Sequence, residues 1–303
     1  MAEIQIPTPP GFAFERTVRS HGWYDLPPFA RDEAAGTLAF AYDGAGGVTA
    51  VTVRAGEGHL AAKTSARGAR GKAETTAVVR SVFRLDEDLT PLRAALAGAP
   101  ALVACVDAGG GRLLRAPTVF EDVVKMLCTT NCSWGLTRVM VTRLVDAAGA
   151  PGPGGVRAFP TAAALAKRPA SFFRDVVRTG YRAPFFKALA TRVARGTLDL
   201  EELRAPSFPS AQAYERLRSI AGIGPYAADN LMRLLGHHDA LGLDSWCRAR
   251  YRKLYPRTRK RNVGLDVAIA RRYRTYAPFS GLAMWLDLTR RWHERDAPQT
   301  LAP

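Results

Sequence analysis

The sequence is poor in the residues that build disulfide frameworks and metal sites. Four cysteines and five histidines occur among its 303 residues. Cys128 and Cys132 lie four residues apart, but no second Cys or His pair follows nearby to complete a tetrahedral zinc site. Cys105 and Cys247 stand alone in the chain. We therefore expect reduced core cysteines, no disulfide framework and no bound metal.

Long apolar runs are also missing. No stretch approaches the roughly 20 apolar residues of a membrane-spanning helix. The N-terminal segment MAEIQIPTPP lacks the basic-then-apolar layout of a secretory signal. We expect a soluble intracellular protein with no membrane partner, cytoplasmic and associated with the nucleoid in a bacterium, or nuclear in a eukaryote.

Acidic residues are scarce beside basic ones. The chain has 27 Asp and Glu against 43 Lys and Arg, which gives a net charge of +16. Residues 244–303 hold fourteen basic and five acidic side chains, so more than half of the excess lies in the last fifth. Taken alone, such a basic run is as often a solvated helical face as it is a binding surface. The whole surplus indicates a polyanionic partner, with nucleic acid first and an acidic membrane surface second.

The N-terminal part favours strands. Residues 37–43 and 48–54 are apolar or alternating and flank the turn-forming residues 44–47, a pattern that predicts a hairpin. We expect a further extended run at 75–85, preceded by a basic mobile loop at 63–72 that could touch phosphate. The predicted first domain, residues 1–85, is thus a small antiparallel sheet.

Helical periodicity begins after Leu85 and continues to the end of the chain. Thr118 and Glu121 have the spacing of a capping box, and the helix that they begin should break near 129–131. The second domain, residues 86–303, is predicted to be all helical. The expected fold class is therefore mainly α with a small N-terminal antiparallel β domain (α+β).

The most informative segment is a predicted helical hairpin at 211–236. Two apolar helical runs are joined by Gly222-Ile223-Gly224, and Pro225 suits the first turn of the second helix. Glycines there permit a tight turn and close approach by another chain. The outward amides would form a phosphate site without base preference. An ordinary helix corner with a glycine C-cap is the alternative interpretation.

Asp244 follows Gly224 by twenty residues, at the start of a basic amphipathic run. Aspartate is a preferred N-cap, so its carboxylate should accept hydrogen bonds from the first amides of that helix. A carboxylate fixed in this way can stabilise positive charge on a sugar ring. Its alternative role is that of a cap alone.

In this order the segments resemble the helix-hairpin-helix DNA glycosylase superfamily, most nearly its 8-oxoguanine and alkylpurine (3-methyladenine) branch. RLLRAPTVFEDVVKMLCTTNCSW, GYRAPFFKALA, the hairpin and the aspartate follow a short sheet, as in that family. The resemblance implies a monomeric base-excision-repair enzyme without cofactor, which flips a damaged base from double-stranded DNA and cleaves its N-glycosidic bond. The iron-sulfur branch needs four cysteines after the hairpin, and only Cys247 lies there.

The resemblance also assigns roles to single residues. Asp244 matches the catalytic aspartate, and Asn131 matches an asparagine that holds the gap left by the flipped nucleotide, although a helix cap is the simpler role. Bifunctional members carry a lysine where this chain has Tyr226, and a phenol cannot form a Schiff base. We therefore expect a monofunctional, hydrolytic enzyme. The alternatives are a lyase using another nucleophile, such as Lys125, and a non-catalytic module that binds damaged DNA.

The base pocket is expected to use residues from several segments. Matching GLAMWLDL to the last family helix places Met284 and Leu288 at the base-reading positions, where neither reproduces the polar reading of 8-oxoguanine. An alkylated, cationic base would instead be favoured by aromatic surfaces, which Trp134, Tyr226, Trp246 and Trp285 could supply. His21 and Asn230 complete the predicted pocket. Arg248 joins the Gly222–Gly224 loop and Asn131 as a predicted DNA contact, and His237 and His238 could flank the DNA.

Overall fold

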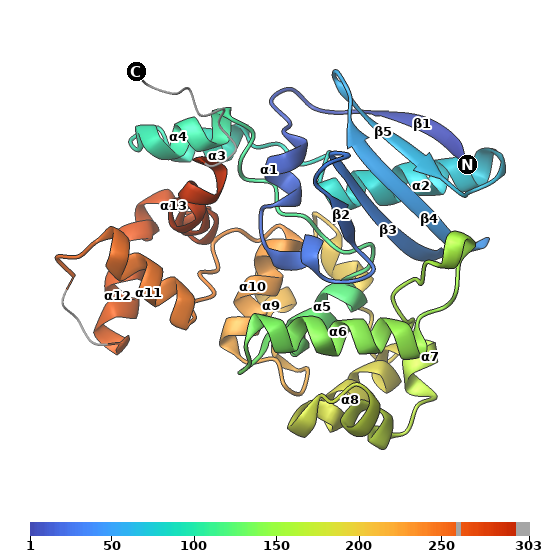
Figure 1. Ribbon diagram of the computed structural model, residues 1–303. Coiled ribbons are helices and arrows are strands. Elements are labelled where there is room, and N and C mark those ends of the chain that lie inside the picture. Colours follow the sequence, from blue (N-terminus) through green and yellow to red (C-terminus); the bar gives the residue numbers. More distant parts are fainter. Residues whose placement is uncertain (259–261, 295–303) are drawn as a thin grey trace.

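The computed structural model describes residues 1–258 and 262–294. Its N-terminal part is a five-stranded antiparallel sheet in the order β1-β5-β4-β3-β2 (Figure 1). The strands are β1 (Ala2–Pro7), β2 (Ala30–Asp32), β3 (Thr37–Gly44), β4 (Gly47–Ala55) and β5 (His59–Thr64). The predicted hairpin is confirmed, because β3 pairs with β4 and the turn closes on the pair Gly44 and Gly47.

The extended run predicted at 75–85 is wrong. Residues 75–83 belong to helix α2 (Gly68–Phe83), which also includes part of the expected loop at 63–72, while β5 includes the start of that loop. Thr75, Val79 and Val82 share one buried face at helical spacing. The Thr75 hydroxyl lies 3.0 Å from that of Tyr42 in β3. The β-branched residues of α2 are typical of a strand, but packing against the sheet makes this segment helical.

After α2 the described residues form helices and loops, with one isolated bridge between Pro151 and Arg157. None of these helices, in the part of the chain that is described, is long and apolar enough to cross a membrane. Their bounds are α3 (Thr90–Ala95), α4 (Pro100–Asp107), α5 (Val119–Thr129), α6 (Trp134–Ala148), α7 (Ala162–Ala166), α8 (Ala183–Ala194), α9 (Ser210–Arg218), α10 (Pro225–Leu235), α11 (Ser245–Leu254), α12 (Asn262–Tyr273) and α13 (Ser280–Glu294).

A single hydrophobic core joins the sheet to the helices. Buried polar contacts reinforce this junction at Asp122 of α5. Its Oδ1 accepts a 2.7 Å hydrogen bond from Trp23 Nε1, and its Oδ2 accepts a 2.9 Å bond from Arg204. Further along, Trp285 of α13 donates to the Ser20 carbonyl at 2.8 Å. The segment that contains short helix α1 (Phe14–Val18) and the turn η1 (Gly22–Asp25) is thereby fixed to α5 and α13, two distant parts of the chain.

The start of α5 is capped differently from a complete capping box. Thr118 accepts from the Glu121 amide as predicted, at 3.1 Å. Glu121 does not reach back, because its carboxylate forms a fully buried 2.6 Å ion pair with Lys125. Glu201 takes over and accepts from the amide of Val119 at 2.8 Å. Burial raises the pKa of Glu121 to about 7, against the opposing effect of the Lys125 charge.

Glu121→Ala tests the buried ion pair. Without the carboxylate, the Lys125 ammonium would remain in the core with no compensating charge, which costs about 3–5 kcal/mol. We expect the free energy of unfolding, measured by urea denaturation, to fall by that amount. Glu215→Ala, at an exposed position of α9, is the control, with an expected change under about 0.5 kcal/mol. Equal effects of the two substitutions would contradict the prediction.

Candidate active site

The predicted hairpin is present as α9, a short turn and α10. Gly222 has a φ of +89°, and a Cβ there would lie 2.6 Å from the Phe185 ring. Gly224 has an ordinary φ of −81°, and a Cβ there would meet only Arg218 Nη1, at 3.9 Å. Gly222 is therefore required by the fold. Gly224 faces open space at the N-terminus of α10, and no side chain caps that terminus.

Asp244 is the N-cap of α11, as the sequence predicted. Its Oδ1 accepts a 2.6 Å hydrogen bond from the Cys247 amide. The loop before it is attached to α10, because Asp229 Oδ2 accepts from the Gly242 amide at 3.1 Å. Gly242 has a φ of +60°, and a Cβ there would lie 2.6 Å from Asn230 Nδ2. The close contact with α10 thus sets where the chain enters α11.

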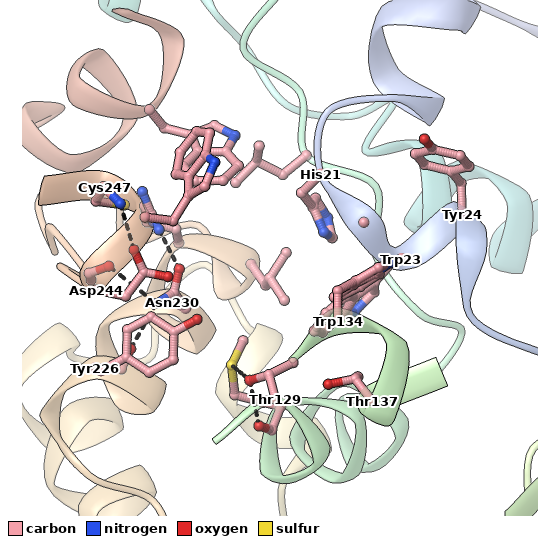
Figure 2. Close-up of a pocket in the computed structure, with 18 of the residues that line it drawn as sticks. His21, Trp23, Tyr24, Thr129, Trp134, Thr137, Tyr226, Asn230, Asp244 and Cys247 are labelled. Atoms are coloured by element: carbon pink, nitrogen blue, oxygen red, sulfur yellow. Dashed lines mark hydrogen bonds between the residues drawn. The ribbon is translucent and has the colours of Figure 1, made fainter. Parts of the chain in front are cut away.

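Asp244 lines a cavity of about 740 Å³. That volume lies in the range of small-molecule sites, roughly 300–1,000 Å³. Figure 2 shows Asp244, Tyr226 and Asn230 on one side and His21, Trp23 and Trp134 on the other. The walls come from the N-terminal segment, α5, α6, α10, α11 and α13. The predicted residues that line the cavity are His21, Trp134, Tyr226, Asn230, Trp246, Trp285 and Asp244.

Aromatic rings form much of the wall. Trp246 of α11 and Trp285 of α13 have ring centroids 5.7 Å apart, and Trp292 of α13 lies 5.4 Å from Trp246. Trp134 belongs to α6 and donates a 2.9 Å hydrogen bond to Asp25 of η1. Such faces can stack on a planar ring. The cavity therefore has the surfaces needed to hold a nucleobase.

Two titratable groups in the cavity are uncharged near neutral pH, and burial shifts the pKa of each further from neutrality. Desolvation lowers the pKa of His21 to about 4, against the effect of the Leu114 carbonyl 2.6 Å from Nε2. Because a carbonyl only accepts, Nε2 carries the proton and Nδ1 is an acceptor. Desolvation, followed by the charge of Asp244, raises the pKa of Tyr226 to about 12. Near neutral pH, Asp244 is therefore faced by an uncharged imidazole and an uncharged phenol.

Solved structures with the same architecture are DNA glycosylases. MBOgg1 in complex with a low-affinity DNA ligand has a TM-score of 0.75 at 20% identity, over 97% of each chain. The 8-oxoguanine glycosylase/lyase of Clostridium acetobutylicum in its apo form has a TM-score of 0.74 at 21% identity, over 95% of this chain and 96% of that one. The 3-methyladenine DNA-glycosylase of Archaeoglobus fulgidus has a TM-score of 0.73 at 19% identity, over 97% and 99%.

This chain has the helix-hairpin-helix DNA glycosylase fold. The predicted fold class, mainly helical with a small N-terminal antiparallel sheet, is confirmed. No family model matches the sequence. No curated protein matches it either.

The prediction that Met284 and Leu288 of the last helix line the base pocket is wrong. Met284 and Leu288 are fully buried in the core and do not line the cavity. They lie one helical turn apart on the inner face of α13, whereas Trp285 and Trp292 face the cavity. The seven-residue spacing of the two tryptophans places them on one helical face and was the signal that could have found Trp292.

A second cavity residue that the sequence analysis missed is Arg233 of α10, which is 3% exposed. It follows Tyr226 by seven residues and so lies on the same face of the helix. Lys125, weighed as an alternative nucleophile, is fully buried in its ion pair and does not line the cavity.

The predicted DNA contacts lie outside the cavity. Asn131 is exposed, has a φ of +46° and donates to the Tyr181 hydroxyl at 3.1 Å. Tyr181 is itself 57% exposed and was not singled out in the sequence. The Ile223 side chain is buried, so only its backbone could meet DNA. Arg248 makes a two-pronged ion pair with Asp266, at 2.7 and 2.8 Å.

Two further expectations concern histidines and metals. His238 was expected to flank the DNA, but it is buried and lies 2.6 Å from the Glu87 carboxylate. Within residues 1–258 and 262–294, no group of three or more His, Cys, Asp or Glu side chains is arranged to hold a metal ion.

The two hairpin glycines make a matched pair for mutagenesis. Gly222→Ala forces a side chain into the left-handed region, at about 1–2 kcal/mol, and against the Phe185 ring. We expect the free energy of unfolding to fall by at least about 2 kcal/mol in total. Gly224→Ala has room and should change it by less than about 0.5 kcal/mol. Equal losses in chemical denaturation would refute this division of roles.

Proposed function

We propose that the protein is a base-excision-repair DNA glycosylase that hydrolyses the N-glycosidic bond of a damaged, alkylated or oxidised base. The observation that carries this proposal is the Asp244 carboxylate, fixed by a helix N-terminus at the wall of an aromatic cavity. The glycosylase fold supports it. A base inside duplex DNA would have to rotate out of its stack to reach this cavity.

The hairpin would hold the DNA backbone. The uncapped N-terminus of α10, with Gly224 open to solvent, offers amide hydrogens and the positive end of the helix dipole to a phosphate. The net charge of +16 adds long-range attraction to DNA. Asn131 and exposed Tyr181 lie together outside the cavity, where they could contact the DNA beside the flipped nucleotide. The proposed partner is therefore double-stranded DNA with a damaged base, bound by a monomer.

In the proposed reaction, the flipped base stacks on the tryptophan walls and its C1′–N bond faces Asp244. Positive charge grows on the sugar as this bond breaks, and the nearby carboxylate stabilises it. Asp244 also orients a water molecule, whose oxygen bonds to C1′ and whose released proton goes to a base that leaves as an anion or, where the base leaves neutral, to solvent. The products are a free base and an abasic site in an intact strand.

The hydrolytic outcome rests on the absence of a usable amine. Tyr226 occupies the place that a lysine holds in bifunctional relatives, and its phenol stays protonated at neutral pH. No lysine is found among the described residues that line the cavity. Lys125 on α5 is fully buried in its ion pair with Glu121. No Schiff base with the sugar is therefore expected.

Asp244→Asn tests the catalytic role. The amide keeps the shape of the side chain but removes its charge, so affinity for a lesion duplex should stay within about threefold. Base release in single-turnover assays should fall by at least about 10³-fold, the upper range for loss of one electrostatic stabiliser. Asp146→Asn, at an exposed position on α6, is the matched control. Release at a tenth of the wild-type rate would remove Asp244 from catalysis.

Borohydride trapping tests the hydrolytic assignment. Wild-type protein mixed with lesion duplex and borohydride should give no covalent protein–DNA band, because no amine reaches the sugar. Tyr226→Lys supplies an amine at the family position, and we expect it to form such a band. A strong wild-type band that persists after further purification would contradict hydrolysis, and mapping it would identify the nucleophile.

A further inference from the structure

A buried guanidinium lines the proposed base cavity. The Arg233 side chain makes no ion pair with any carboxylate of the described residues. It donates instead to the side-chain oxygen of Asn230 and, at 3.3 Å, to the Gly281 carbonyl. Buried arginines usually meet a carboxylate, because an uncompensated charge in the interior is costly. Arg233 therefore brings a positive charge to the cavity that hydrogen bonds to neutral oxygens do not cancel.

The two carboxylates that act on the Arg233 charge make their hydrogen bonds to backbone amides and not to the guanidinium. Asp229 and Asp244 both act on the Arg233 charge from a distance. Asp229 accepts from the Gly242 amide and Asp244 from the Cys247 amide. Arg233 has five N–H donors. Its side chain donates two hydrogen bonds, to Asn230 and to the Gly281 carbonyl, which leaves donor capacity that a ligand in the cavity could use.

The same guanidinium lies over an aromatic wall. Its central carbon is 5.1 Å from the centroid of the Trp285 ring. A cation already occupies this face of Trp285, so the face cannot attract a cationic base as a free tryptophan would. A second positive charge in the cavity would also be repelled by Arg233. From the sequence we expected the aromatic residues to favour a cationic base. At Trp285 the Arg233 guanidinium opposes this preference.

The charge of the base decides how it leaves the sugar. When the C1′–N bond breaks, its electron pair goes to the base. A purine carrying a positive charge from alkylation departs neutral, whereas a neutral base departs as an anion and then takes up the proton released by water. A fixed guanidinium stabilises the second kind of leaving group and does not help the first.

The opposite wall supplies an acceptor. His21 is neutral, its Nε2–H is taken by the Leu114 carbonyl, and no described residue donates to its Nδ1. A damaged base with both a carbonyl oxygen and a ring N–H could therefore face donors at Arg233 and an acceptor at His21. Oxidised and deaminated purines carry both groups.

We propose that Arg233 determines substrate specificity by selecting neutral, carbonyl-bearing bases that leave as anions over cationic alkylated purines. This inference rests on the proposed glycosylase function. It makes Arg233 a specificity-determining residue that contacts the base, while Asp244 acts on the sugar.

The test uses the full chain and identical duplexes that carry one 8-oxoguanine, one hypoxanthine or one 7-methylguanine. Single-turnover release is measured for each and divided by the rate without protein. The specificity ratio is the enhancement for a neutral base divided by the enhancement for 7-methylguanine, and we expect it to be at least ten in the wild type. Arg233→Met keeps an apolar side chain without the charge and should lower this ratio by at least thirtyfold. Arg233→Lys, which keeps the charge, should give an intermediate ratio.

Arg195→Met, at an exposed position after α8, is the matched control and should leave the ratio unchanged. Thermal denaturation and affinity for undamaged duplex show whether Arg233→Met is folded. If this variant does not fold, the specificity ratio of the wild type alone decides whether neutral bases are preferred. Greater wild-type enhancement for 7-methylguanine, or equal slowing of all lesions in Arg233→Met, overturns the inference and leaves the proposed function standing. No release of any base overturns both.

Discussion

The attachment of the 242–244 loop to α10 is the constraint on which the candidate site depends. Asp229 binds the Gly242 amide, and Gly242 approaches the Asn230 side chain so closely that no Cβ fits between them. Because α10 also begins at the hairpin turn, one helix sets the positions of the proposed phosphate contact and of Asp244. The distance between the gripped backbone and the reacting sugar would thus be fixed within a rigid element, as catalysis by orientation requires.

The rest of the cavity depends on contacts between distant segments. Asp122 joins Trp23 of the N-terminal segment to Arg204, and Trp285 binds the Ser20 carbonyl. These bonds place His21 opposite α10 and complete a cavity that no single part of the chain contains. The small sheet therefore contributes to the site by positioning the segment that connects its first two strands (Figure 1).

Local signals were sufficient for the elements that local chemistry determines. The Gly222–Gly224 turn, the Thr118 cap and the Asp244 cap each follow from residues within a few positions of one another. The helix at 68–83 was missed because its β-branched residues suit either a strand or a helix, and only the sheet beneath it decides. Such a choice requires tertiary information.

The residues of the cavity wall also depend on tertiary packing that the local sequence does not reveal. Met284 and Leu288 face the core while Trp285 and Trp292 face the cavity, and a sequence match does not reveal which side of α13 packs inward. The charge of Arg233 is equally hidden in the sequence, where an arginine in a helix usually indicates solvent exposure. Its burial against Trp285 depends on how α10 and α13 meet.

The glycosylase fold of this chain is proposed to carry a site that removes a damaged base by hydrolysis. The most direct measurement incubates the full chain with a panel of duplexes, each with one damaged base, and analyses the labelled strand before and after hot alkali. We expect at least one lesion to give strand breaks after alkali and none before it, because an abasic site is left in an intact strand. No alkali-dependent break on any lesion, despite measurable binding to the same duplexes, would contradict this proposal and identify the protein as a non-catalytic reader of damaged DNA.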